Sequence, residues 1–129
     1  MRYTLNIYFP NFSVKGEIEM NIQIFGHKKC FDTKKAERFF KERKIKYQLI
    51  DILDKGISKR EYQSVSQAVG GMDNLINKSS KDYYLLDHML QRDMEFHLLE
   101  NPSIFHTPIV RNGKQATVGY HPEIWKTWE

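Results

Sequence analysis

The stretch Ile22-Gln-Ile-Phe-Gly-His-Lys-Lys-Cys30 decides the fold of this chain of 129 residues. Ile22 and Ile24 alternate with polar residues, a pattern that predicts a short half-buried strand, and Gly26 closes it. Residues 31–44 then carry apolar side chains at helical spacing, which predicts a helix with one face toward the core; this face holds Ala36, Phe39 and Phe40. Cys30 is therefore predicted to lie in the turn between this strand and the start of this helix.

The chain beyond this helix continues as an alternating α/β protein. Residues 45–51 alternate apolar and polar side chains, which predicts a second strand. A strand, a helix and a strand in this order make a right-handed crossover, so the two strands should be parallel. Ser58 and Glu61 have the spacing of a capping box that begins another helix, and Gly70-Gly71 ends it. Further helical segments are expected at residues 72–76, 81–90 and 93–99.

The last part of the chain predicts a β-hairpin and a closing helix. Asn112-Gly113 lies between two short extended runs, residues 108–111 and 114–118, and this is a strong hairpin signal. Pro122 stands near the start of the final helix. The order β-α-β, helical block, β-hairpin and C-terminal helix is typical of an α/β thioredoxin-like fold with a mixed four-stranded sheet. The helical block is then an insertion between the two halves of that fold.

Composition limits the classes of function. The length fits one domain with a proper core. The 20 Lys and Arg residues against 16 Asp and Glu give a net charge of +4, too weak to indicate direct nucleic-acid binding. The single cysteine excludes a disulfide framework and a four-thiolate metal site. No run of about 18 apolar residues occurs, so no membrane span is expected. We expect a cytoplasmic monomer without a bound metal.

Residues 1–19 stand apart from this plan as an N-terminal extension, and the domain proper is expected at residues 20–129. Lys15-Gly16-Glu17, shortly before Met20, is what a purine-rich ribosome-binding site encodes when it is translated in frame. One hypothesis is therefore that Met20 is the natural start and that the extension is not native. The other is that residues 3–7, which alternate apolar and polar side chains, add an edge strand. N-terminal sequencing of the native protein distinguishes the two.

Cys30 has the setting of a reactive thiol. Free N–H groups at a helix N-terminus stabilise an anion, and nearby cations do the same; the lysines near Cys30 in sequence are Lys28, Lys29, Lys34 and Lys35. The competing interpretation is an inert buried cysteine, which is common. Thr33 occupies the position where a second cysteine would complete a Cys-x-x-Cys pair. An oxidised Cys30 would therefore need an external thiol to reduce it.

Two further groups are candidates for the same site. His27 is interpreted as a loop residue or as a group that tunes the thiol, because His27 and Cys30 alone do not make a zinc site. In His106-Thr107-Pro108, a proline opens a predicted strand, and X-Pro in a tight turn is where cis peptide bonds occur. In thioredoxin-type folds such a loop faces the active cysteine, and Thr107 would then offer its backbone N–H and C=O to an extended thiol substrate. The alternative for Pro108 is an ordinary proline at a strand start.

Several short stretches, in their order and spacing, carry a resemblance to a known family: residues 22–30, Lys34-Lys35-Ala36, Asp51 with Gly56, Ser58 and Glu61, Asn101-Pro102, Pro108-Ile109-Val110 and Val118-Gly119-Tyr120. With them, residues 20–129 resemble the arsenate reductase (ArsC/Spx-like) family of thioredoxin-fold proteins, which includes the Spx-type transcription regulators. The resemblance implies that Cys30 has the place of the family's nucleophilic cysteine, which attacks arsenate in the reductases before glutathione or glutaredoxin resolves the adduct.

The sequence departs from the reductases where they carry arginines. Thr107 stands where an arginine holds the oxyanion, and neither residues 75–79 nor Tyr120-His121-Pro122 contains another. Lys78 and Arg111 are only loose substitutes for bidentate donors. Arsenate reduction is therefore not expected. Threonine before this proline is instead what glutaredoxin-like sites carry, which favours glutathione or another thiol as the substrate.

We therefore expect a single-cysteine thiol-dependent reductase or a glutathione-linked oxidoreductase, with Cys30 as the catalytic nucleophile and no bound cofactor. The external reductant would be glutathione or a glutaredoxin-like protein. The expected thiol-binding residues are Thr107, Pro108, Lys29, Lys34, His27 and His106. The alternative is an Spx-like regulator that binds RNA polymerase without a Cys-x-x-Cys switch, in which case the chain is not an enzyme.

Overall fold

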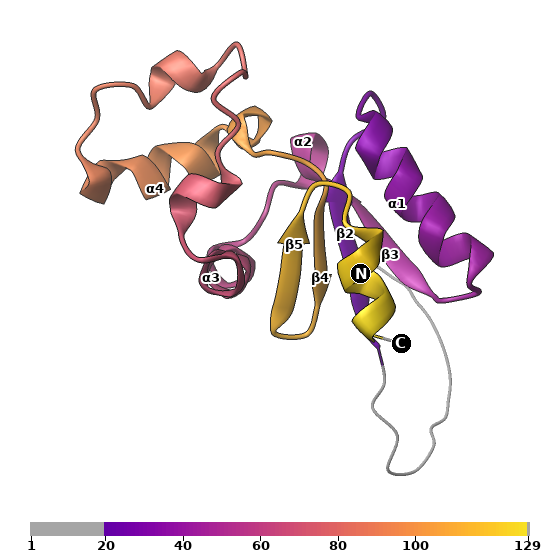
Figure 1. Ribbon diagram of the computed structural model, residues 1–129. Helices are drawn as coiled ribbons and strands as arrows, with labels where there is room; N and C mark the ends of the chain where they lie inside the picture. The colour runs from indigo at the N-terminus through magenta and orange to yellow at the C-terminus, as the bar shows by residue number, and fades with distance from the viewer. Residues whose placement is uncertain (1–19, 129) are drawn as a thin grey trace.

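The fold is built on one mixed sheet of four strands in the order β3-β2-β4-β5 (Figure 1). The computed structural model describes residues 20–128, so the hypotheses about residues 1–19 fall outside the described residues. β2 pairs in parallel with β3 and antiparallel with β4, which pairs antiparallel with β5. The strands are β2 (Ile22–Gly26), β3 (Tyr47–Asp51), β4 (Ile109–Asn112) and β5 (Gln115–Val118). The predicted thioredoxin-like fold with a mixed four-stranded sheet is confirmed.

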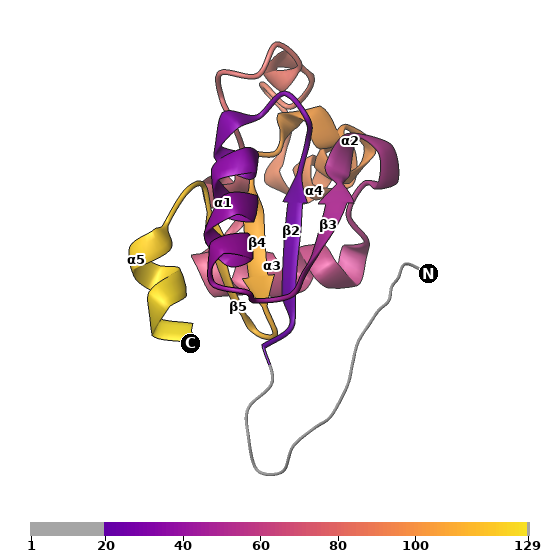
Figure 2. The same ribbon diagram turned by 90° about the vertical axis from the view of Figure 1, so that its right-hand side faces the viewer.

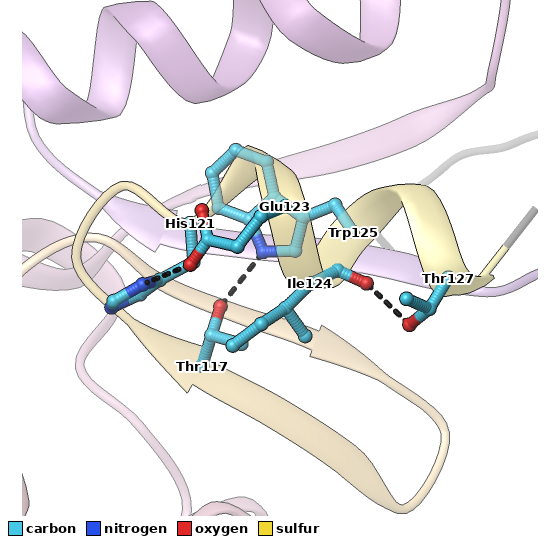
Figure 3. A network of polar contacts seen from close by, with 6 residues as sticks. All are labelled: Thr117, His121, Glu123, Ile124, Trp125 and Thr127. Carbon is cyan, nitrogen blue, oxygen red and sulfur yellow. Dashed lines mark hydrogen bonds and ion pairs between the residues drawn. The ribbon is translucent and has the colours of Figure 1, made fainter.

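One face of the sheet is covered by α1 (Phe31–Glu42), α5 (Pro122–Trp125) and the short 3-10 helix η5 (Lys126–Trp128) (Figures 1 and 2). The predicted stripe of α1 packs there around Trp125, whose side chain is fully buried; the same cluster holds Ile22, Ile24, Ala36, Phe39, Phe40 and Val110. The Trp125 indole N–H donates to the Thr117 hydroxyl of β5 at 2.8 Å, which ties the closing helix to the sheet (Figure 3).

The opposite face is covered by α3 (Lys59–Val69) and by the helical insertion (Figure 1). Side chains alternate along a strand, so neighbouring residues of β2 and β4 point to opposite faces of the sheet. Phe25 and Ile109 pack on this face, whereas Ile24 and Val110 pack on the face that holds Trp125. The capping box of Ser58 and Glu61 forms as predicted, and Gly70 ends the helix in the left-handed conformation. α3 buries Tyr62 and Val65 against the sheet.

The insertion contains short helices that lie between α3 and β4; they are η2 (Met72–Leu75), η3 (Tyr83–Leu85), α4 (Gln91–Glu100) and η4 (Pro102–Ile104). The helix expected at residues 81–90 is reduced to the single 3-10 turn of η3, and turns follow at residues 86–88. His88 has a φ of 70°, in the left-handed region that a helix cannot continue through. α2 (Ile52–Lys55) follows β3 directly, with Asp51 as its cap.

The predicted β-hairpin joins β4 to β5. Its two turn residues are Gly113 and Lys114, since Asn112 still pairs with Gln115. Gly113 has a φ of 60°, a conformation that a two-residue hairpin turn requires of its first residue and that glycine adopts without strain. Among residues 20–128, no helix has both the length and the apolar character needed to cross a membrane.

Candidate functional site

Three segments that are distant in sequence meet at one end of the sheet. β2 ends there at Gly26, α1 begins there, and residues 105–108 lead into β4 beside them, with α2 alongside (Figures 1 and 2). Because β2 and β4 are antiparallel neighbours, the C-terminal end of β2 lies next to the N-terminal end of β4. The fold therefore brings Cys30 and Thr107, which are 77 residues apart, into contact.

Cys30 is the N-cap residue of α1. Its backbone N–H donates to the His27 carbonyl at 3.1 Å, which closes the turn after β2, and its carbonyl accepts from the Lys34 N–H at 3.4 Å. The cap has no side-chain hydrogen bond to the first helical turn, and the side chain is half-buried. Cys30 therefore lies at the positive end of a helix of 12 residues.

Thr107 makes two contacts with the thiol. Its hydroxyl donates to Cys30 Sγ at 3.2 Å, and its carbonyl accepts from the Cys30 thiol at 3.6 Å. The Thr107–Pro108 peptide bond is cis, and Pro108 is buried with its carbonyl accepting from the Gly119 N–H at 2.8 Å. Thr107 therefore contacts the sulfur through both its hydroxyl and its carbonyl, and it holds the Cys30 side chain at the start of β4.

Gly26 and Thr33 set how closely α1 approaches β2. Thr33 is 2% exposed, and a Cβ on Gly26 would lie 2.3 Å from its hydroxyl oxygen and 2.5 Å from its methyl carbon. The Thr33 hydroxyl has no hydrogen-bond partner among residues 20–128. The missing side chain of Gly26 therefore makes room for the first turn of α1, and with it for the position of Cys30.

The remaining predicted residues lie at different distances from the thiol. His27 lies in the turn before Cys30 and lines the neighbouring pocket. Lys29 and Lys34 are exposed, and no contact joins their side chains to Cys30 within the described residues. His106 is also exposed and turns toward the end of β5, with its Nε2 3.8 Å from the place of a Cβ on Gly119. The geometry thus brings Thr107 and the backbone of His27 to Cys30, whereas the side chains of Lys29, Lys34 and His106 make no described hydrogen bond with the thiol.

A pocket of about 200 Å³ opens beside this site. His27 and Thr107 form its wall toward Cys30, and the rest of its lining comes from α2 and from the insertion: Leu53, Ser80, Lys81, Asp82, Pro102, Ser103 and Phe105. Sequence reasoning missed these residues, because they are brought together only by the packing of the insertion. The one signal in the sequence was Asn101-Pro102, which carries part of the family resemblance.

Comparison with known sequences assigns this arrangement to a family. The sequence model of the ArsC family matches residues 25–128, which include the end of β2, the whole of α1 and the Thr107–Pro108 segment described above. The chain belongs to the ArsC family. The resemblance inferred from its motifs is therefore confirmed.

Proteins similar to this ArsC-family chain include both a transcriptional regulator and an arsenate reductase. It is 32% identical over 110 residues to the global transcriptional regulator Spx 2 of Oceanobacillus iheyensis, covering 81% of this chain and 80% of that protein. The arsenate reductase of Vibrio cholerae superposes with a TM-score of 0.72 at 25% identity, over 83% of this chain and 96% of that one. An arsenate reductase related protein of Brucella melitensis superposes with a TM-score of 0.61 at 20% identity, over 88% and 98% of the two chains, which shows the shared fold.

The site of this ArsC-family chain has no arginine among its described contacts. Arg111, one of the two substitutes considered from the sequence, lies across from Gln23 in the first half of β2. Its guanidinium donates to the Gln23 side chain at 2.7 Å and to the Gly113 carbonyl at 3.1 Å. It therefore belongs to the other end of the sheet. Within residues 20–128, no arginine lines the pocket or hydrogen-bonds Cys30, and no cluster of three His, Cys, Asp or Glu side chains could hold a metal ion.

Proposed function

We propose that this ArsC-family protein is a single-cysteine thiol–disulfide oxidoreductase in which Cys30 is the nucleophile. The observation that carries the proposal is the pair of contacts between Cys30 Sγ and Thr107, at 3.2 Å and 3.6 Å, directly before Pro108. The thiolate is the attacking species in thiol–disulfide exchange, and a helix N-terminus and a hydroxyl donor are groups that favour an anion beside them.

Thr107 is proposed to hold the backbone of the substrate as well as the sulfur. It lies in the loop before β4, and its N–H donates to no other described residue. Its carbonyl already faces the thiol. An extended thiol substrate could therefore pair with the Thr107 backbone while its own sulfur reaches Cys30.

The exchange of Cys30 with a disulfide needs no bound cofactor, because the electrons come from the thiols themselves. The Cys30 thiolate attacks one sulfur of a disulfide, a new bond forms between Cys30 and that sulfur, and the other sulfur leaves as a thiolate that takes a proton from water. A second, external thiol such as glutathione then attacks the mixed disulfide and releases Cys30. Since Thr33 stands in place of a second cysteine, the external thiol is obligatory.

Arsenate is a poor substrate for this site. An oxyanion in water is held by bidentate, charged donors such as arginine. The position before Pro108 holds Thr107, and Arg111 is engaged at the far end of the sheet. We therefore expect no arsenate-dependent turnover above that of the Cys30→Ser variant.

The proposal is tested by incubating the reduced protein with oxidised glutathione and measuring the mass of the intact chain. We expect one glutathione adduct per chain, absent in Cys30→Ser. Thr107→Val should slow adduct formation because it removes the hydroxyl donor, whereas Thr107→Ser, which keeps the donor, should retain most of the rate. No adduct on folded protein, or an equal rate for Thr107→Val and Thr107→Ser, would contradict the proposed role of these residues.

A second candidate is an Spx-like regulator that binds RNA polymerase. It is favoured by the 32% identity to the regulator of Oceanobacillus iheyensis. Thr33 removes the Cys-x-x-Cys pair, so binding would not depend on the redox state of this chain. Co-purification with RNA polymerase subunits that is equal for the wild type and Cys30→Ser would support it, and its absence would leave the oxidoreductase as the account of this protein.

A further inference from the structure

The pocket beside Cys30 has no role in the exchange reaction itself. Thr107 lines this pocket and also hydrogen-bonds the thiol, and His27 lies in the wall between them. The pocket therefore borders the residue that contacts the sulfur, while Cys30 itself is not part of the lining. A group attached to a sulfur that reacts with Cys30 can reach this opening past Thr107.

The lining of the pocket suits an apolar group. Leu53, Pro102 and Phe105 supply its apolar wall. The polar groups around them already satisfy each other: the Ser103 hydroxyl donates to the Asp82 carboxylate at 2.5 Å, and the Asp82 N–H donates to the Ser80 hydroxyl at 3.2 Å. The polar groups of Ser80, Asp82 and Ser103 therefore bond within the wall of the pocket.

The charge of the pocket does not favour an anion. Lys81 and Asp82 both line it, so their charges offset each other. No arginine lies in its lining. The lining itself therefore carries no net charge from Lys81 and Asp82 that would hold an arsenate ion or the carboxylates of glutathione, whereas an apolar side chain would lose contact with water there.

Two large apolar side chains near the site are exposed among the lysines that flank Cys30. Phe31, the residue after Cys30, is 79% exposed, and Leu53 in the lining of the pocket is 51% exposed. A polypeptide partner is large enough to cover both. A small thiol such as glutathione would leave much of the apolar area of Phe31 and Leu53 uncovered.

We propose that this pocket holds an apolar side chain adjacent to the reacting cysteine of an extended polypeptide, so that the preferred partner of Cys30 is a peptide or protein disulfide. The inference rests on the proposed function and names its substrate class. Neighbouring Cα atoms are about 3.8 Å apart, and disulfide-linked Cα atoms about 4.4–6.8 Å, so the residue next to the reacting cysteine can reach a pocket that borders Thr107. In glutathione the cysteine has no apolar neighbour to fill the pocket.

The test measures how fast the reduced full-length protein forms a mixed disulfide with three symmetric disulfides. These are a blocked pentapeptide with leucine on both sides of its cysteine, the same peptide with glycine in those positions, and oxidised glutathione. In each case the Cys30 thiolate displaces one peptide or glutathione thiolate, and the mass of the intact chain reports the adduct. We expect the leucine peptide to react about tenfold faster than the other two, the factor that 1.4 kcal/mol of apolar burial supplies.

Leu53→Asn replaces an apolar side chain of the pocket lining by a polar one without changing the charge. Leu90→Asn is its matched control. Leu90 is 59% exposed at the start of α4 and does not line the pocket. Loss of the leucine preference in Leu53→Asn, with its retention in Leu90→Asn, supports the inference. Equal rates for all three disulfides in the wild type overturn the inference while the proposed function stands. Failure of every disulfide to react overturns both.

Discussion

Gly26→Ala tests the contact that places the first turn of α1 against β2. A Cβ at position 26 would lie 2.3 Å from the Thr33 hydroxyl oxygen, 2.5 Å from its methyl carbon and 3.0 Å from its Cβ. Ordinary contacts between carbon atoms are about 3.5–4 Å, so the helix must move by roughly 1 Å or Thr33 must leave its rotamer. Gly26 does not have a positive φ, so its backbone is open to alanine and only this contact opposes the substitution.

The expected cost follows from overpacking. Forcing extra atoms into a packed core costs about 1–3 kcal/mol, and we expect Gly26→Ala to reduce the free energy of unfolding by about 2 kcal/mol. Thr33→Ala removes the two nearest atoms. It loses a buried methyl, worth about 0.8 kcal/mol, but also removes a buried hydroxyl without a partner, so alone it should be nearly neutral.

A double-mutant cycle isolates this contact. In the Thr33→Ala background the closest remaining approach is the Cβ pair at 3.0 Å, so Gly26→Ala should cost less there, with a coupling energy of about 1–2 kcal/mol. Urea unfolding followed by tryptophan fluorescence measures it, since Trp125 is fully buried in the cluster that packs α1. Equal costs of Gly26→Ala in both backgrounds, or no cost in either, would refute the contact.

Three further predictions concern Thr33 in α1, Tyr47 in β3 and the cap of α3. Thr33→Cys restores a Cys-x-x-Cys pair at the start of α1, so mild oxidation should give an intramolecular disulfide with Cys30, seen as the loss of both free thiols without a mass adduct. Burial, with the hydrogen bond to Glu37 at 2.8 Å, raises the pKa of Tyr47. The unfolded chain therefore ionises first, and stability should fall as pH rises above about 10, less steeply in Tyr47→Phe when urea midpoints are compared. Ser58→Ala removes the α3 cap and should lower the free energy of unfolding by about 1 kcal/mol in the same assay.

The sequence was sufficient for the local elements whose signals lie within a few residues. The alternation of Ile22 and Ile24, the stripe of α1 and the capping box at Ser58 each depend on neighbouring side chains, and each is present in the structure. Thr107 was expected beside Cys30 because a proline loop of this kind faces the active cysteine in thioredoxin-type folds, and the contact across 77 residues is present.

The rest depended on packing between distant segments. The pocket takes Leu53 from α2, Asp82 from the turn before η3 and Phe105 from the approach to β4, and no periodicity in the sequence relates them. The clash that Gly26 avoids is likewise visible only once α1 lies on β2. The apolar pattern predicts helix through residues 86–88, where the structure has turns, because the left-handed conformation of His88 leaves no mark in that pattern.

The most direct test of the central claim is the alkylation rate of Cys30 in the folded chain compared with the same chain unfolded in urea. Because Cys30 is the single cysteine, both states report one thiol. If the helix start and Thr107 stabilise the thiolate, the folded protein should react faster than the unfolded chain with iodoacetamide at neutral pH, and Thr107→Val should lose part of that advantage. A folded wild type that reacts no faster than its unfolded chain would contradict the assignment of Cys30 as a nucleophile.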